Sequence, residues 1–207
     1  KYLDLIANSK VYDVATNTPI SYAANISTKL GNDVFLKRED MQPIFSFKIR
    51  GAYNKIANLG AQQKKRGVLT ASAGNHAQGV ANACRKLKIP CLIVMPVTAP
   101  EIKIKAVKRL GAKVKLFGDN FDQASKKAIQ LSKEKKIEFI EAFDDPYTIA
   151  GQGTVGKEIL DADPSLDVIF VPVGGGGLLA GISAWAAQTQ SKTKVYGVEV
   201  EDSACLT

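Results

Sequence analysis

Hydrophobic residues in this chain follow two patterns, short apolar runs and apolar positions spaced three or four residues apart. The runs predict strands at residues 34–36, 68–71, 91–95, 114–117, 139–142, 168–173 and 195–200. The helical spacing predicts helices at residues 2–7, 19–30, 47–59, 75–87, 100–110, 121–135, 146–160 and 178–188. This alternation is typical of an α/β fold with helices on both faces of parallel sheets. No repeat or linker divides the chain, so two domains, if present, are interleaved.

One predicted helix start, around Lys48, combines features that favour a reactive amine. Ser46 stands where an N-cap is expected, because its hydroxyl can accept a hydrogen bond from an unpaired backbone N–H. Lys48 then lies in the first turn, where the helix dipole disfavours a cation, and Phe45 and Phe47 predict apolar surroundings. Both effects lower the pKa of a lysine and leave an amine that can attack a carbonyl. The alternative is a solvated lysine at a helix end.

A turn of small residues, Ser72, Ala73 and Gly74, joins a predicted strand to a helix that starts with Asn75 and His76. Small residues there let backbone N–H groups point outward at the positive end of a helix, which makes an anion site. The side chain of Asn75 adds a hydrogen-bond donor and an acceptor that can contact a hydroxyl on a ligand ring. The alternative is an ordinary turn between a strand and a helix.

Four consecutive glycines, Gly174, Gly175, Gly176 and Gly177, follow the apolar run at residues 168–173 and precede a helix near Leu178. Glycines lose much conformational freedom on folding, so four in a row indicate that the backbone closely approaches a ligand. The dipole of the following helix suits a phosphate. A flexible linker is the alternative, but linkers rarely join a buried strand to an apolar helix.

The glycines at positions 151, 153 and 156 fit the spacing of a dinucleotide-binding fingerprint, but their context does not. Asp145 and Pro146 precede them, which indicates a helix start with Asp145 as its cap rather than a strand. We therefore expect these glycines to allow close helix packing and reject a nicotinamide site.

Composition limits the remaining function classes. With 45% hydrophobic and 23% charged residues, the 207-residue chain is typical of a globular protein, and no apolar run approaches the ~20 residues of a membrane span. The net charge of +8 comes from basic clusters that alternate with apolar residues, as on solvated helix faces. We expect no binding to nucleic acids or membranes. The single histidine and the scattered cysteines (Cys84, Cys91, Cys205) argue against zinc sites, histidine triads and disulfides.

Residues 37–43 and 45–54 resemble the threonine dehydratases of the biosynthetic type, and the likeness continues through residues 74–79 and the four glycines. These enzymes belong to fold-type II of the pyridoxal 5'-phosphate (PLP) enzymes, whose fold is like that of tryptophan synthase β. The resemblance implies a small domain at residues 42–143, inserted into a larger domain formed by residues 1–41 and 144–207. It also implies deamination of L-threonine to 2-oxobutanoate for isoleucine biosynthesis, with L-serine as a second substrate.

The same resemblance assigns roles to individual residues. Lys48 would hold PLP as a Schiff base and take the substrate α-proton, with Phe47 beside it. Asn75 would contact the PLP hydroxyl, and the cofactor phosphate would lie on the four glycines and Leu178. The substrate carboxylate would lie on the turn formed by Ser72, Ala73, Gly74, Asn75 and His76.

Two alternative functions are compatible with these residues. Serine racemases and catabolic serine/threonine dehydratases share the fold, but they usually have glycine where this chain has Phe45. Some of them bind a divalent cation near the position of Glu199, with an acidic residue six positions later; Cys205 stands there, so we expect no metal. The second alternative is a non-catalytic phosphate-binding domain, which would not need Lys48.

The resemblance also suggests that the large domain is incomplete at Thr207, because the serine that meets the pyridine nitrogen in these enzymes has no counterpart here. We therefore expect residues 1–207 alone to be poorly active, and a full-length protein to be a homo-oligomer. A cytoplasmic location is expected, and an organelle stays open because the chain starts at Lys1. Regulation and the preference between threonine and serine are not decided by these residues.

Overall fold

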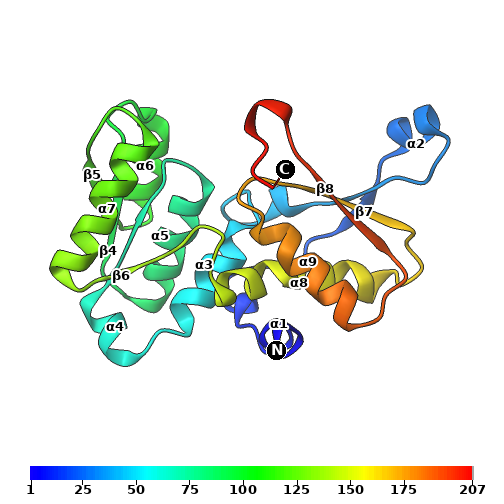
Figure 1. The fold of residues 1–207 in the computed structure, drawn as a ribbon, viewed down its shortest axis with the longest axis horizontal. Helices are drawn as coiled ribbons and strands as arrows, with labels where there is room; N and C mark the ends of the chain where they lie inside the picture. Colours follow the sequence, from blue (N-terminus) through cyan, green and yellow to red (C-terminus); the bar gives the residue numbers. More distant parts are fainter. Residues whose placement is uncertain (207) are drawn as a thin grey trace.

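The computed structural model describes residues 1–206 (Figure 1). Within these residues, a four-stranded parallel sheet has the order β5-β4-β3-β6. Its strands are β3 (Val68–Ala71), β4 (Cys91–Met95), β5 (Lys113–Leu116) and β6 (Glu138–Phe139). A parallel pair is formed by β7 (Val168–Pro172) and β8 (Lys194–Val198), and an antiparallel pair by β1 (Ile20–Tyr22) and β2 (Phe35–Lys37). The predicted α/β class is confirmed, with the antiparallel pair as an addition.

The helices agree with the predicted pattern except near the N-terminus and at residues 61–66. They are α1 (Tyr2–Ala7), α2 (Ala24–Leu30), α3 (Lys48–Ala57), α4 (Ala61–Arg66), α5 (Asn75–Leu87), α6 (Glu101–Arg109), α7 (Phe121–Lys135), α8 (Pro146–Ala162) and α9 (Gly177–Gln188). Three short 3-10 turns lie at Val11–Asp13, Glu39–Met41 and Glu201–Ser203. The helix predicted at 19–30 is wrong in its first part, because Ile20–Tyr22 pairs with Phe35–Lys37 instead. Helix α4 was not predicted, since Ala61–Arg66 has no buried residue and hence no apolar stripe.

Two separate cores divide the structure into the two sides visible in Figure 1. On one side, alternate residues of β3 and β4 face opposite layers: Val68 and Ile93 pack with α3, α5 and α6, while Leu69 and Val94 pack with α7. On the other side, a core between α1, α8 and α9 contains Ile6, Val155, Ile182 and Trp185. This separation agrees with an inserted small domain, whose boundaries at residues 42 and 143 stay a prediction.

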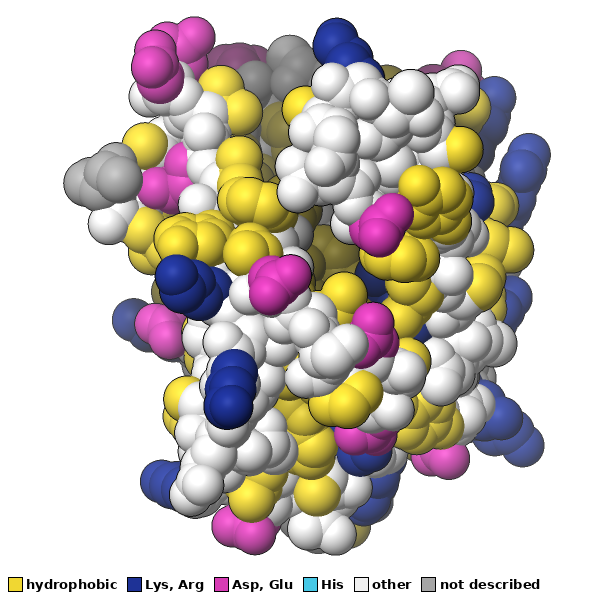
Figure 2. Space-filling view, turned by 90° about the vertical axis from the view of Figure 1, so that its right-hand side faces the viewer, with side chains coloured by type: hydrophobic (Ala, Val, Ile, Leu, Met, Phe, Trp, Pro, Cys, Tyr) yellow, Lys and Arg dark blue, Asp and Glu magenta, His cyan; other side chains and the backbone are white. Residues whose placement is uncertain are grey.

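Hydrophobic side chains are also exposed on the side that carries α2 and β7, which faces the viewer in Figure 2. A groove of about 1270 Å³ lies there between the β1–β2 pair, α2 and β7. Phe170 of β7 is 70% exposed and stacks on Tyr196 of β8, with ring centroids 5.8 Å apart. None of the helices within residues 1–206 combines the length and apolar character that a membrane crossing needs.

Helix α3 packs against α5 and α8, and glycines of α8 allow its close contacts with α3 and with α9. A Cβ atom on Gly151 of α8 would lie 2.7 Å from the Cα of Gly51 in α3, and one on Gly156 would lie 3.0 Å from the Cα of Ile182 in α9. The expectation that these glycines serve helix packing is confirmed. Asp145 caps α8 by accepting hydrogen bonds from the backbone N–H groups of Tyr147 and Thr148, also as expected.

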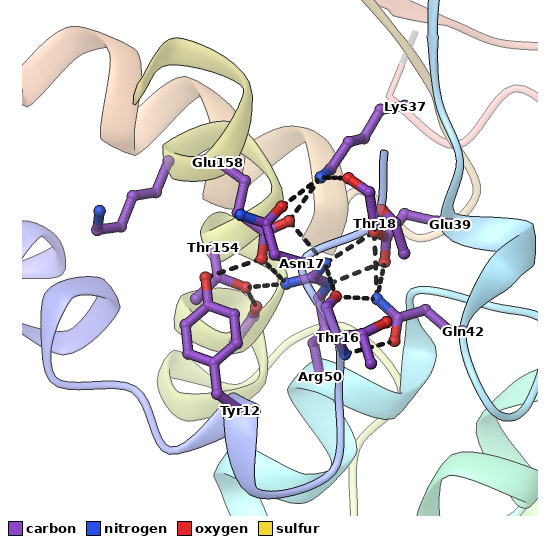
Figure 3. Close-up of polar contacts among 12 residues, drawn as sticks. Tyr12, Thr16, Asn17, Thr18, Lys37, Glu39, Gln42, Arg50, Thr154 and Glu158 are labelled. Atoms are coloured by element: carbon purple, nitrogen blue, oxygen red, sulfur yellow. Dashed lines mark hydrogen bonds and ion pairs between the residues drawn. The ribbon is translucent and has the colours of Figure 1, made fainter. Parts of the chain in front are cut away.

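A buried ion network, not foreseen in the sequence, ties α3 to α8 and to the N-terminal flank (Figure 3). The guanidinium of Arg50 is fully buried and donates to both carboxylate oxygens of Glu39 and of Glu158, at 2.6–2.9 Å. The Nζ atom of Lys37 lies 2.7 Å from Glu158, and the Tyr12 hydroxyl donates to the same carboxylate. Burial opposes the charge of Glu158, but the hydrogen bonds from Arg50 and Lys37 outweigh it and keep the pKa of this carboxyl below its ordinary value. Two cations thus match two carboxylates.

The only histidine is part of the core around the four-stranded sheet. His76 is 5% exposed, and its Nε2 atom lies 3.1 Å from both the Thr70 hydroxyl and the backbone oxygen of Ile140. Burial, reinforced by the nearby charge of Lys48, lowers the pKa of His76 to about 4, although the Ile140 contact acts in the opposite direction. The imidazole is therefore neutral at pH 7.

Replacing Arg50 by Met should strongly destabilise the fold, because Glu39 and Glu158 would keep buried negative charge without their main partner. We expect a loss of about 3–5 kcal/mol in the free energy of unfolding, measured by urea denaturation. Arg38→Met is the matched control, since Arg38 pairs with Asp40 at the surface and its removal should cost much less. Equal losses in the two variants would contradict a structural role for the network.

The free energy of unfolding should decrease when the pH is lowered, because of His76. The unfolded chain binds a proton there near pH 6.5 and the folded chain near pH 4, so the stabilisation is complete above pH 6.5 and is lost as the pH falls towards 4. Between pH 6.5 and 5, about 2 kcal/mol of the free energy of unfolding should be lost through this group. The His76→Asn variant should lack this component. An imidazole NMR signal that titrates near pH 6.5 in the folded protein would contradict the assignment.

Candidate functional site

Lys48 is the first residue of α3, and its amine is partly buried. Its Nζ atom donates to the backbone oxygen of Ala142 at 2.7 Å and lies 5.5 Å from the ring centroid of Phe47. Burial lowers the pKa of this amine, as the sequence predicted. One predicted cause is wrong: the side chain of Phe45 is 78% exposed and gives Lys48 no apolar cover. The position of the cap is also shifted, since Phe47 is the N-cap residue, but the Ser46 hydroxyl still accepts from the Lys48 N–H at 3.2 Å.

The predicted turn before α5 lies at the carboxyl end of β3, and α5 contacts the backbone of Lys48. A Cβ atom on Gly79 would lie 2.8 Å from the Lys48 carbonyl oxygen, so only glycine allows this approach. Helix α5 begins with Asn75, which is exposed and follows Gly74. The Ser72 hydroxyl accepts from the Gly74 N–H at 3.1 Å, so it shapes the turn. Ala73 is half-buried. The imidazole of His76 points into the core, which leaves only its backbone for a ligand at this turn.

The four-glycine segment joins β7 to α9 and lies against Phe143. A Cβ atom on Gly175 would lie 2.3 Å from the Phe143 ring, and one on Gly177 would lie 2.8 Å from the Phe143 carbonyl oxygen. Gly176 has a φ of +81°, which favours glycine, and it is the N-cap residue of α9. No side chain within residues 1–206 caps this helix, so its first N–H groups are available to an anion. Gly174 is exposed, and Leu178 lies in the first turn of α9.

Residues 142 and 143 link the lysine to the glycines. Ala142 accepts the hydrogen bond from Lys48, and Phe143, its neighbour, packs on Gly175. Sequence analysis missed this link because residues 139–142 read only as a strand. A cavity of about 510 Å³ adjoins the glycines and is lined by Phe143, Ile149, Gly175, Gly176, Gly177 and Leu179 among others, whereas Lys48 and Asn75 do not line it.

These residues fit an aldehyde cofactor that carries a phosphate. The pKa of the Lys48 amine is lowered, which favours attack on a carbonyl. The glycine segment is a cradle at a helix N-terminus in which a side chain on Gly175 would collide with Phe143. Within residues 1–206, no group of three or more His, Cys, Asp and Glu side chains is arranged to hold a metal ion. The carboxylate of Glu199 accepts hydrogen bonds from the backbone N–H groups of Cys205 and Leu206.

Comparison with known proteins identifies the family. The chain is 54% identical over 206 residues to a biosynthetic L-threonine dehydratase of Pasteurella multocida, and 52% identical to the chloroplastic biosynthetic threonine dehydratase of Arabidopsis thaliana. It spans 40% and 34% of the lengths of these two relatives.

Solved structures agree. The processed form of threonine deaminase isoform 2 from Solanum lycopersicum superposes with a TM-score of 0.94 at 49% identity, over 96% of this chain and 55% of that one. Maize serine racemase superposes with a TM-score of 0.90 at 34% identity, over 95% of this chain and 60% of that one. Residues 11–207 match the family described as pyridoxal-phosphate dependent enzyme, and the chain therefore belongs to that family.

Proposed function

We propose that this chain forms the lysine-bearing part of a PLP-dependent enzyme that deaminates L-threonine to 2-oxobutanoate and ammonia in isoleucine biosynthesis, and that also converts L-serine to pyruvate. The observation that carries the proposal is the convergence of Lys48 and the glycine segment on residues 142 and 143. The biosynthetic threonine dehydratases at about 50% identity support the choice of substrate.

In this proposal, Lys48 would bind PLP covalently and Phe47 would flank it. Asn75 would meet the ring hydroxyl, and the backbone of Gly174, Gly175, Gly176, Gly177 and Leu178 would hold the phosphate. PLP supplies an electron sink that stabilises negative charge at the substrate Cα. The substrate carboxylate would lie on the N–H groups of the turn from Ser72 to His76. These assignments place the cofactor phosphate and the substrate carboxylate each at a helix N-terminus.

Lys48 would also take the α-proton of the substrate at its Nζ atom, because its lowered pKa favours the form that accepts a proton. The single histidine is an unsuitable base, since its imidazole is occupied by Thr70 and Ile140 inside the core. Within residues 1–206, the amine of Lys48 donates to a neutral carbonyl, that of Ala142, and has no carboxylate partner that would stabilise its protonated form.

A serine racemase is the second candidate, because a solved serine racemase superposes at 34% identity. Phe45 argues against it. Its φ of +58° favours glycine, the residue expected in serine racemases, and this chain instead keeps an exposed aromatic residue there. We also propose the division into residues 42–143 and their flanks, a homo-oligomer of the full-length protein and a cytoplasmic or organellar location.

Changing Lys48 to Ala should abolish covalent binding of PLP and the release of 2-oxobutanoate from threonine. The adduct can be trapped with borohydride and located by mass spectrometry of the purified chain. Lys55→Ala is the matched control, because Lys55 lies on the same helix but pairs with Asp145 at 2.8 Å and should not react. Trapped PLP on the Lys48→Ala protein would contradict the assignment. Racemisation of serine without release of ammonia would favour the second candidate.

Two changes at Gly175 should separate phosphate binding from packing. Asp and Asn have nearly the same size, so both should displace the Phe143 ring to the same extent, but only Asp places a negative charge beside the phosphate. We expect Gly175→Asp to bind PLP about tenfold more weakly than Gly175→Asn in a fluorescence titration, which corresponds to about 1.4 kcal/mol. Equal dissociation constants for the two variants would mean that the segment does not hold the phosphate.

A further inference from the structure

The first turn of α3 obtains one of its hydrogen bonds from another helix. The N–H groups of Lys48 and Arg50 donate to the preceding residues Ser46 and Phe47. The N–H of Gly51, in contrast, donates to the side-chain oxygen Oε1 of Gln152 on α8, at 3.1 Å. The amide groups at a helix start need partners from outside the helix, and here the partner comes from 101 residues later in the chain.

Gln152 lies directly against this turn. A Cβ atom on Gly51 would lie 2.4 Å from Nε2 of Gln152 and 2.7 Å from the backbone oxygen of Thr148. Helix α5 approaches the same turn through Gly79, at 2.8 Å from the Lys48 carbonyl oxygen. Two helices therefore fix the backbone that carries Lys48, and α8 adds a side-chain acceptor for a backbone N–H of this turn.

Packing alone does not account for a glutamine at this position. Gln152 is 1% exposed, and its Nε2 atom finds no hydrogen-bond partner within residues 1–206. A buried amide donor without a partner costs folding free energy, so a methionine of the same length would be the better filler. What glutamine adds is the Oε1 atom that accepts a hydrogen bond from the Gly51 N–H.

We propose that Gln152 is a positioning residue for Lys48: its Oε1 atom holds the first turn of α3 at the depth where the Lys48 amine reaches the Ala142 oxygen. The inference rests on the proposed function of Lys48. Without the bond, the Gly51 N–H is unpaired and the turn can move towards solvent. Lys48 would then be less buried, which weakens its reaction with PLP at neutral pH.

Three variants test this proposal. Gln152→Met keeps the shape but removes the oxygen, whereas Gln152→Glu keeps a carbonyl oxygen, because burial favours the neutral acid. Thr148→Val is the matched control: it lies one turn earlier on α8, is 1% exposed, and its hydroxyl has no partner within residues 1–206. The readouts are hydrogen exchange at the Gly51 amide, the dissociation constant for PLP and the pH midpoint of the borohydride-trapped adduct.

Gln152→Met should lose protection of the Gly51 amide, bind PLP about tenfold more weakly and form the adduct with a midpoint about half a pH unit higher. Gln152→Glu should be close to the wild type in amide protection, PLP affinity and pH midpoint. Thr148→Val should match the wild type in all three. If Gln152→Met also matches Thr148→Val, or if Met and Glu are equally impaired, the proposal is overturned.

Failure of the proposed function gives a different result. If the full-length wild-type protein forms no adduct on Lys48, that function is wrong. The titration of the Lys48 amine, followed by NMR after ¹³C-methylation, then decides the positioning role without PLP. A higher pKa in Gln152→Met than in Thr148→Val supports the role, and equal values overturn it.

Discussion

The buried guanidinium of Arg50 is the constraint on which the arrangement of this chain depends. A fully buried cation is stable only if carboxylates surround it, and the two that do so come from distant segments, Glu39 before α3 and Glu158 near the end of α8. The N-terminal flank, α3 and α8 must therefore meet at one point. Lys37 and Tyr12 complete the charge and hydrogen-bond balance around Glu158.

This constraint also orients Lys48. Residues two apart on a helix point about 200° away from each other, so anchoring Arg50 on one side turns Lys48 to the opposite side. There Lys48 reaches Ala142, and Phe143 brings the glycine segment to the same place. The ion network and the candidate site are thus two faces of one helical turn, and the close contacts of α3 with Gly79 and Gly151 leave this turn little room to rotate.

Local sequence predicted the elements whose burial follows their own pattern, such as β3, β4, α5 and α7. It failed where the local structure or the burial of a residue depends on distant segments of the chain. Residues 20–22 form a strand because residues 35–37 pair with them. The burial of Arg50 was not predicted, because its carboxylates lie 11 and 108 positions away. Lys48, the turn at Asn75 and the four glycines carried local signals. The link through Ala142 and Phe143 had none, because a backbone oxygen and an aromatic contact leave no mark in the sequence.

Comparison of the buried lysines explains why Lys48 differs from the others. Lys37 lies 2.7 Å from Glu158, and Lys55 lies 2.8 Å from Asp145, so each has a carboxylate as its ion-pair partner. Within residues 1–206, Lys48 has no carboxylate within 4 Å, and its partner is a neutral backbone oxygen. The dipole of α3 and burial both act against its charge, and the neutral imidazole of His76 nearby does not offset them. The fold thus pairs two lysines with carboxylates and leaves the third without one, and burial shifts the pKa of that third lysine towards the form that a nucleophile needs.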